Sequence, residues 1–239
     1  MSSPLLANRK RLEALELSRK ASTENAASMP ESHVSESEWD LVRQSMDSHE
    51  RALKGLKRID DKEAYKTRHF AEYEAYLLRQ DLPGDLKVKF MIWLFDINDV
   101  ARAVPCALEC LDANLAMPER IKRDLPTWLF HTVLDWAERS FKQEHSVEPY
   151  FSNVLERVKA ARTFEDLEAR YYKLAGLMAL GAVTTKIKHV SEPERLYQAK
   201  ALFVKAQDLY ESVGVGTRLT DIDKRLLKLN MPLEPDSQS

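Results

Sequence analysis

Apolar residues recur along most of the chain at steps of three and four, which is the spacing of one face of an α-helix. The first such run lies between Glu38 and Arg79 and contains Trp39, Val42, Met46, His49, Leu53 and Leu56. Beyond Ile59 the apolar set moves to a rotated face of the helical wheel, so we expect a bend or turn near Asp60–Asp61. The pattern therefore predicts a long amphipathic helix or a helix pair in this region.

Later helices are bounded by proline, glycine and capping residues. In the middle of the chain, helices are expected over Leu86–Asp96, after Asp99 as an N-cap, over Trp128–Phe141 and over Tyr150–Ala161. In the last third, the pattern predicts one helix ending by Gly181, a second over Glu194–Ser212, and a third opened by Thr220 paired with Asp223. We therefore expect an all-α fold of helical hairpins behind a long N-terminal amphipathic helix or helix pair.

The amino-acid composition supports a helical fold and bears on the cellular location of the protein. Hydrophobic residues make up 44% of the chain, charged residues 31%, and there are six glycines, which favours helix over sheet. No stretch approaches the roughly 18 apolar residues that cross a bilayer, and no secretory signal is expected, so we predict an intracellular protein without a membrane partner. Cys106 and Cys110 share one helical face without neighbouring ligands and are expected to be buried thiols; no metal or cofactor is expected.

Cations gather on one side of the segment from Arg51 to Arg68, which has seven Lys or Arg residues and three acidic residues. On a continuous helical wheel, an arc of about 120° opposite the apolar seam contains Arg51, Lys54, Arg58, Lys62, Lys66 and His69. Such a face can follow the phosphates of duplex DNA, although it can also be a solvated surface partly paired with Asp61 and Glu63. The candidate DNA-binding residues are Arg51, Lys54, Lys57, Arg58, Lys62 and Lys66, together with Arg9, Lys10 and Arg11 in a second basic group near the N-terminus.

Candidate catalytic residues are sparse. A nuclease that uses metal ions needs several converging carboxylates, and the best candidates are Asp96 and Asp99, followed by Glu109 and Asp112. The competing interpretation is structural, because Asp99 can cap a helix and Asp96 can end the preceding one. No phosphate-binding GxxxxGK[ST] loop or nucleophile motif is present, so the residues favour a binding subunit over an enzyme.

Four segments are expected from these patterns. Residues 1–37 form a flexible basic arm and linker, and residues 38–82 form a basic helical segment for DNA binding or oligomerisation. Residues 83–230 form a helical-hairpin core domain that begins at a proline and glycine turn, and residues 231–239 form a flexible tail.

The order of features resembles the small terminase subunit of tailed bacteriophages, a family whose members in temperate phages are named "terminase, endonuclease subunit". The similarity is strongest over Trp93–Asp99, the Ala-rich helix that follows, and the Leu115–Ala–Met117–Pro118 loop before Pro126–Phe130. Family members also have a Lys-rich helical segment upstream, which the cations from Lys54 to Lys66 match. The resemblance extends over roughly Leu41 to Leu229.

The resemblance implies an all-helical, ring-forming homo-oligomer in the host cytoplasm. Such a subunit binds double-stranded viral DNA and presents it to the large terminase subunit, which carries the ATPase, for cutting and packaging into the prohead. Two alternatives remain: a Mg²⁺-dependent endonuclease subunit that cuts the packaging site with Asp96 and Asp99, and a tetratricopeptide-like scaffold that binds only protein.

Overall fold

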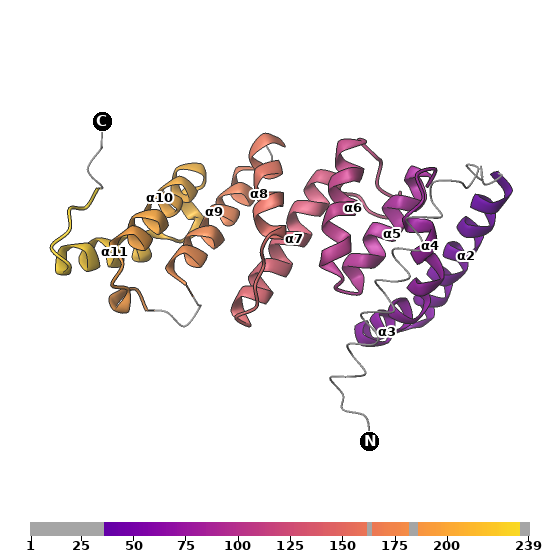
Figure 1. Cartoon of the computed structure of the whole chain (residues 1–239), viewed down its shortest axis with the longest axis horizontal. Helices are drawn as coiled ribbons and strands as arrows, with labels where there is room; N and C mark the ends of the chain where they lie inside the picture. Colours follow the sequence, from indigo (N-terminus) through magenta and orange to yellow (C-terminus); the bar gives the residue numbers. More distant parts are fainter. Residues whose placement is uncertain (1–35, 162–163, 182–185, 235–239) are drawn as a thin grey trace, which may run out of the picture. The chain divides into compact units, whose positions relative to one another are not determined.

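A computed structural model describes residues 36–161, 164–181 and 186–234 (Figure 1). Every regular element in these ranges is helical, which confirms the predicted all-α fold. None of the helices described has the length and apolar character that crossing a membrane requires.

The helices follow one another with short connections. In chain order they are α2 (Glu36–Gly55), α3 (Ile59–Phe70), η1 (Ala71–Tyr73), α4 (Glu74–Leu77), α5 (Gly84–Asp96), α6 (Val100–Asp112), α7 (Leu125–Lys142), α8 (Tyr150–Ala161), α9 (Glu165–Leu180), η2 (Ile187–His189), α10 (Pro193–Leu209), η3 (Glu211–Val213) and α11 (Gly216–Lys228).

The chain divides into two compact units, residues 1–52 and 53–239. In the first unit, the described residues belong to α2, whose apolar Trp39, Val42 and Met46 lie on one side of the helix. The last turn of α2 and all later helices belong to the second unit.

The predicted helix end at Ser212 was wrong, because α10 stops at Leu209, and three further helix boundaries were also wrong. The break expected near Asp60–Asp61 lies earlier, because α2 ends at Gly55 and α3 begins at Ile59. Helix α7 begins at Leu125, where Asp124 accepts a 2.9 Å hydrogen bond from the Thr127 amide and Pro126 occupies a first-turn position that needs no N–H.

The third of these further errors concerns the last helix. Thr220 does not cap α11, which already begins at Gly216; its hydroxyl donates a 3.1 Å hydrogen bond to the Gly216 carbonyl inside the helix. Asp223 instead pairs with Lys200 of α10 at 2.8 Å.

In the second unit, the hydrophobic core next to α3 and η1 is centred on α5. Its residues from Phe90 to Leu94 are buried without interruption, so its neighbours cover it on several sides. Phe90 lies 6.3 Å from the Phe70 ring and 5.2 Å from the Tyr73 ring, measured between ring centres. Aromatic rings at these separations bury large areas and fix the angle between α3 and α5.

Helices α7, α8 and α9 meet around Tyr171. Its ring stacks on Phe151 at 5.3 Å, and its hydroxyl donates a 2.7 Å hydrogen bond to the Phe130 carbonyl. Burial raises the pKa of Tyr171 well above its ordinary value, so the phenol stays protonated and keeps this hydrogen bond. On α6, Cys106 and Cys110 are buried free thiols, as predicted.

Helices α9, α10 and α11 share a core of their own, in which α9 and α10 form a hairpin (Figure 1). Arg195 in the first turn of α10 donates to the last carbonyls of α9, those of Ala179 and Leu180, and so satisfies groups that a helix end leaves unpaired. The buried members of this core are Ala169, Tyr172, Leu180, Val190, Leu196, Ala199, Phe203, Ala206, Val213, Val215, Ile222 and Leu226.

The α9–α10 contact depends on a missing side chain at Gly176. A Cβ atom there would lie 2.5 Å and 2.7 Å from two ring carbons of Phe203, closer than carbon atoms pack. We expect Gly176→Ala to lower the free energy of unfolding by about 1–2 kcal/mol, because overpacking outweighs the gain in helix propensity. Urea denaturation followed by circular dichroism measures this change.

Gly216→Ala is the matched control, because Gly216 is exposed in the first turn of α11 and nothing lies within 4 Å of a Cβ at this position. It should leave stability unchanged or raise it slightly. Equal effects of the two substitutions would contradict the packing explanation.

Candidate nucleic-acid interface

Three of the six candidate cations between Arg51 and Lys66 are available to a ligand. Lys54 closes α2, Lys57 lies in the connection, and Lys62 follows in the first half of α3. None of the three makes an ion pair with a residue that the structure describes, and Lys54 and Lys57 are exposed. The connection between α2 and α3 is therefore a compact source of positive charge.

The other three cations are engaged. Lys66 is mostly buried, pairs with Asp96 at the end of α5, and lies 5.6 Å from the centre of the Trp93 ring. The Arg58 guanidinium lies 3.8 Å from the Asp60 carboxylate. Arg51 donates a 3.3 Å hydrogen bond to the Asp47 carbonyl one turn earlier in α2.

The helical wheel that predicted one continuous basic face assumed an unbroken rod, and this assumption was wrong. Gly55 ends α2, and Arg58 has extended backbone angles immediately before α3. Glycine is a poor helix former, while Asp60 and Asp61 suit the positive end of a new helix. The basic face is therefore reduced to the cations around this connection.

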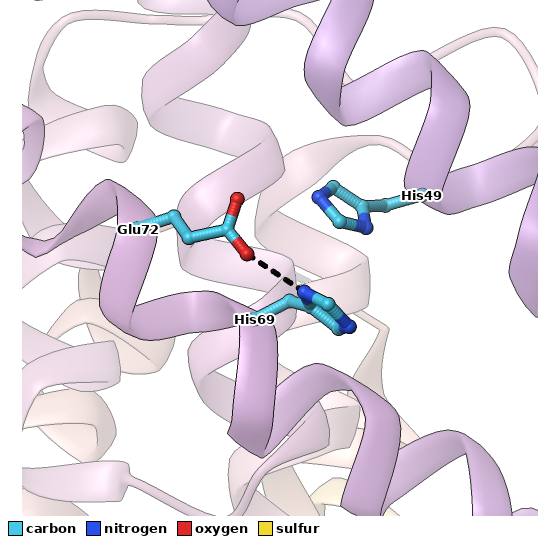
Figure 2. Close-up of side chains that lie close together, drawn as sticks. All are labelled: His49, His69 and Glu72. Atoms are coloured by element: carbon cyan, nitrogen blue, oxygen red, sulfur yellow. Dashed lines mark hydrogen bonds and ion pairs between the residues drawn. The ribbon is translucent and has the colours of Figure 1, made fainter.

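His69, which the wheel placed on the same face, also has an acidic partner. Figure 2 shows the His69 ring and the Glu72 carboxylate, whose nearest nitrogen and oxygen are 2.7 Å apart. The ring also packs against Tyr65 with 4.4 Å between ring centres. Figure 2 labels His49 as well, which belongs to α2 and the first unit. Arg9, Lys10 and Arg11 lie outside the described residues.

Each candidate catalytic carboxylate has a cationic partner. Asp96 pairs with Lys66, as above, and Asp99 lies 2.7 Å from the Arg102 guanidinium. Glu109 lies 2.5 Å from Lys87, and Asp112 lies 2.9 Å from Arg157. Within the described parts of the chain, these four acids form no group of three that could reach one ion. A magnesium site needs several converging oxygens, which this arrangement does not provide.

Asp99 has a definite structural role. Its carboxylate accepts a 3.2 Å hydrogen bond from the Arg102 amide as the N-cap of α6, as the sequence predicted. The Arg102 side chain also contacts Glu74 at 2.9 Å and lies 5.5 Å from the centre of the Phe70 ring. Arg102 therefore joins the start of α6 to the end of α3 and the start of α4, and Asp99 holds the Arg102 side chain in place.

A second group of cations was missed by the sequence analysis. It lines a cleft of about 890 Å³ formed by α7, α9, η2 and α11. We name this feature the basic cleft; its cations include Lys142, Lys173, Lys188, Arg218, Lys224 and Lys228. The recurrence of Arg218, Arg225 and Lys228 at helical spacing was the available signal, but the other cations come from distant parts of the chain.

The basic cleft also contains a partly buried amine. Lys173 donates a 2.6 Å hydrogen bond to the Val213 carbonyl. Burial lowers the pKa of Lys173, and the positive charge of Arg218 lowers it further. The positive charge around this amine is therefore not fully compensated within the second unit.

Most of α2 and all of α3 to α8 lie within a match to a known protein family. A family model described as "Phage small terminase subunit" matches residues 43–166. Because this match covers more than half of the chain, the protein belongs to the phage small terminase subunit family. The predicted resemblance is thereby confirmed.

A relative with a more specific name is known. Over 150 residues the chain is 28% identical to the "Probable terminase, endonuclease subunit" of Haemophilus phage HP1 (strain HP1c1). The aligned region covers 62% of this chain and 52% of the relative, so the chain spans about half of that protein's length. No solved structure matches the chain.

Substitutions at Asp99 separate its capping of α6 from its ion pair with Arg102. We expect Asp99→Ala to lower the free energy of unfolding by about 1 kcal/mol, whereas Asp99→Asn should retain most of the stability because asparagine caps helices nearly as well. Thermal unfolding of the two variants checks this. Equal destabilisation by alanine and asparagine would show that the cap contributes little and that the charge next to Arg102 dominates.

Proposed function

We propose that this protein is the terminase subunit that binds double-stranded viral DNA and presents it to the large terminase subunit for cutting and packaging. Family membership supports a role in phage DNA packaging. The observation that carries the DNA-binding part is the group of unpaired cations around the α2–α3 connection.

The chemistry of this connection suits phosphate more than base edges. Lys54, Lys57 and Lys62 are flexible ammonium groups that can approach phosphates without fixed geometry. Binding through such contacts is salt-dependent and mostly independent of sequence.

The remaining parts of the proposal follow from the family. The subunit forms a homo-oligomer, most simply a closed ring, that acts in the host cytoplasm together with the large subunit. The N-terminal cations Arg9, Lys10 and Arg11 add phosphate contacts to those of the α2–α3 connection.

Charge reversal tests the DNA contact. We expect the triple variant Lys54→Glu, Lys57→Glu and Lys62→Glu to weaken binding to duplex DNA strongly, because three attractive contacts become repulsive. The slope of log Kd against log salt should fall in magnitude by about 0.9 for each phosphate that the variant no longer neutralises, or by up to about 3 in total. Gel-shift titrations between low and moderate salt measure both quantities.

The control changes the net charge equally but scatters the substitutions: Arg139→Glu, Lys159→Glu and Lys205→Glu lie on α7, α8 and α10. This variant should keep the slope and most of the affinity. If the two triple variants bind DNA alike, the α2–α3 connection is not the contact surface. If neither the variants nor the wild type binds DNA, a scaffold that binds only protein becomes the better explanation.

A cutting role is a second candidate, because the name of the HP1 relative contains the word endonuclease. The experiment is to incubate purified protein with cognate DNA and Mg²⁺ and to compare wild type with Asp96→Asn. Nicking by the wild type that the variant abolishes would support it. Given the pairing of Asp96 with Lys66, we expect no difference between the two proteins.

A further inference from the structure

The basic cleft has two kinds of lining that together define what can bind there. Eight cationic and two acidic side chains line it, and one of those acids, Glu138, already lies 3.2 Å from Arg170. Its floor is apolar and includes Phe141, Leu177 and Ile187, which remain partly exposed. An occupant must therefore supply negative charge and an apolar group at the same time.

The rim cations are available for such an occupant. Lys142, Lys188, Lys224 and Lys228 are exposed and make no ion pair with any residue in the described ranges. An acidic ligand would also relieve the repulsion between Lys173 and Arg218. Charge complementarity therefore favours an acidic partner.

The shape and floor of the cleft argue for a protein segment over nucleic acid. The cleft has a volume of about 890 Å³, which is too small for duplex DNA to enter. A duplex would contact only the rim and leave the apolar floor exposed. Single-stranded binding sites use several aromatic platforms for the bases, and Phe141 is the one aromatic residue that lines this cleft among the described residues. An exposed apolar side chain flanked by carboxylates fits both parts of the lining.

Such a segment is present at the start of α9. Phe164 is 64% exposed, and Glu165 and Asp166 follow it in the first helical turn. Glu165 and Asp166 are exposed, and neither makes an ion pair with a residue that the structure describes. We name these three residues the acidic turn.

A copy of the chain cannot place its own acidic turn in its own cleft. Both features share α9, with the acidic turn at the N-terminus of the helix and Lys173, Leu174 and Leu177 lining the cleft towards its C-terminus. At 1.5 Å per residue, Phe164 and Leu177 are about 20 Å apart along the helix axis. The two surfaces can therefore meet only between copies.

A similar segment elsewhere fits less well. Ile59 is 79% exposed and is followed by Asp60 and Asp61. However, Arg58 and Lys62 flank these acids, and Arg58 already lies 3.8 Å from Asp60. The two cations offset the two acids, so the turn at Ile59 does not suit a basic cleft.

We propose that the acidic turn of one copy of this chain inserts into the basic cleft of the next copy, with Phe164 on the apolar floor and Glu165 and Asp166 among the rim cations. This contact joins two different surfaces, so it is head-to-tail, and repetition closes a ring if the rotation allows it. The inference rests on the homo-oligomer in the proposed function and names the residues that form its interface.

The test reverses the charge of each surface in the full-length protein. Variant A carries Glu165→Lys and Asp166→Lys, and variant B carries Lys188→Glu, Lys224→Glu and Lys228→Glu. Size-exclusion chromatography with light scattering gives the mass, at a concentration at which the wild type is assembled. Each variant alone should shift towards the 27.5 kDa monomer. A chain carrying both sets of substitutions should recover the mass of the wild-type assembly.

Asp60→Lys with Asp61→Lys is the matched control, because it reverses two acids in an exposed first turn of another helix, α3; it should retain the wild-type assembly. Circular dichroism verifies that each variant is folded, and recovery in the doubly reversed chain excludes misfolding as the cause of monomerisation. If variants A and B assemble like the wild type, or if the doubly reversed chain remains monomeric, this interface is wrong. A monomeric wild type would instead contradict the homo-oligomer in the proposed function.

Discussion

The close packing of α9 on α10 is the constraint on which the C-terminal part of the second unit depends. Phe203 occupies the space that any side chain at position 176 would need, so the two helices approach each other directly. Arg195 ties the end of α9 to the start of α10, and α11 then packs on the same core. Helix α9 is thereby held so that its middle and C-terminal turns line the basic cleft while its first turn stays exposed.

The distribution of paired and unpaired charges is as informative as the packing. Asp96, Asp99, Glu109 and Asp112 each lie beside a cation from elsewhere in the chain or from the next turn. The exposed pairs of Glu109 and Asp112 contribute at most about 1 kcal/mol each, so their main effect is to cancel local charge. Among the described residues, unpaired cations remain around the α2–α3 connection and in the basic cleft, and both surfaces suit acidic partners.

Local features of the fold could be predicted from the sequence, whereas features built from distant residues could not. The three- and four-residue apolar spacing predicted the helices, and the position of Asp99 predicted the cap of α6. The same reasoning placed the first break too late, since it followed the apolar pattern and ignored Gly55. The pair between Lys66 and Asp96 joins residues 30 positions apart, and the basic cleft draws on residues from 138 to 228, so neither leaves a local pattern.

The two basic surfaces differ in ways that match the two different partners proposed for them. At the α2–α3 connection, the ammonium groups of Lys54 and Lys57 are exposed, and their attraction to a polyanion decreases steeply with salt because binding releases counterions. In the basic cleft, similar cations surround an apolar floor, and burial of a ring there gains free energy that salt does not screen. A contact of the second kind can persist at ionic strengths that release DNA from the first. The proposed contact between copies would therefore outlast the proposed DNA contact as salt rises.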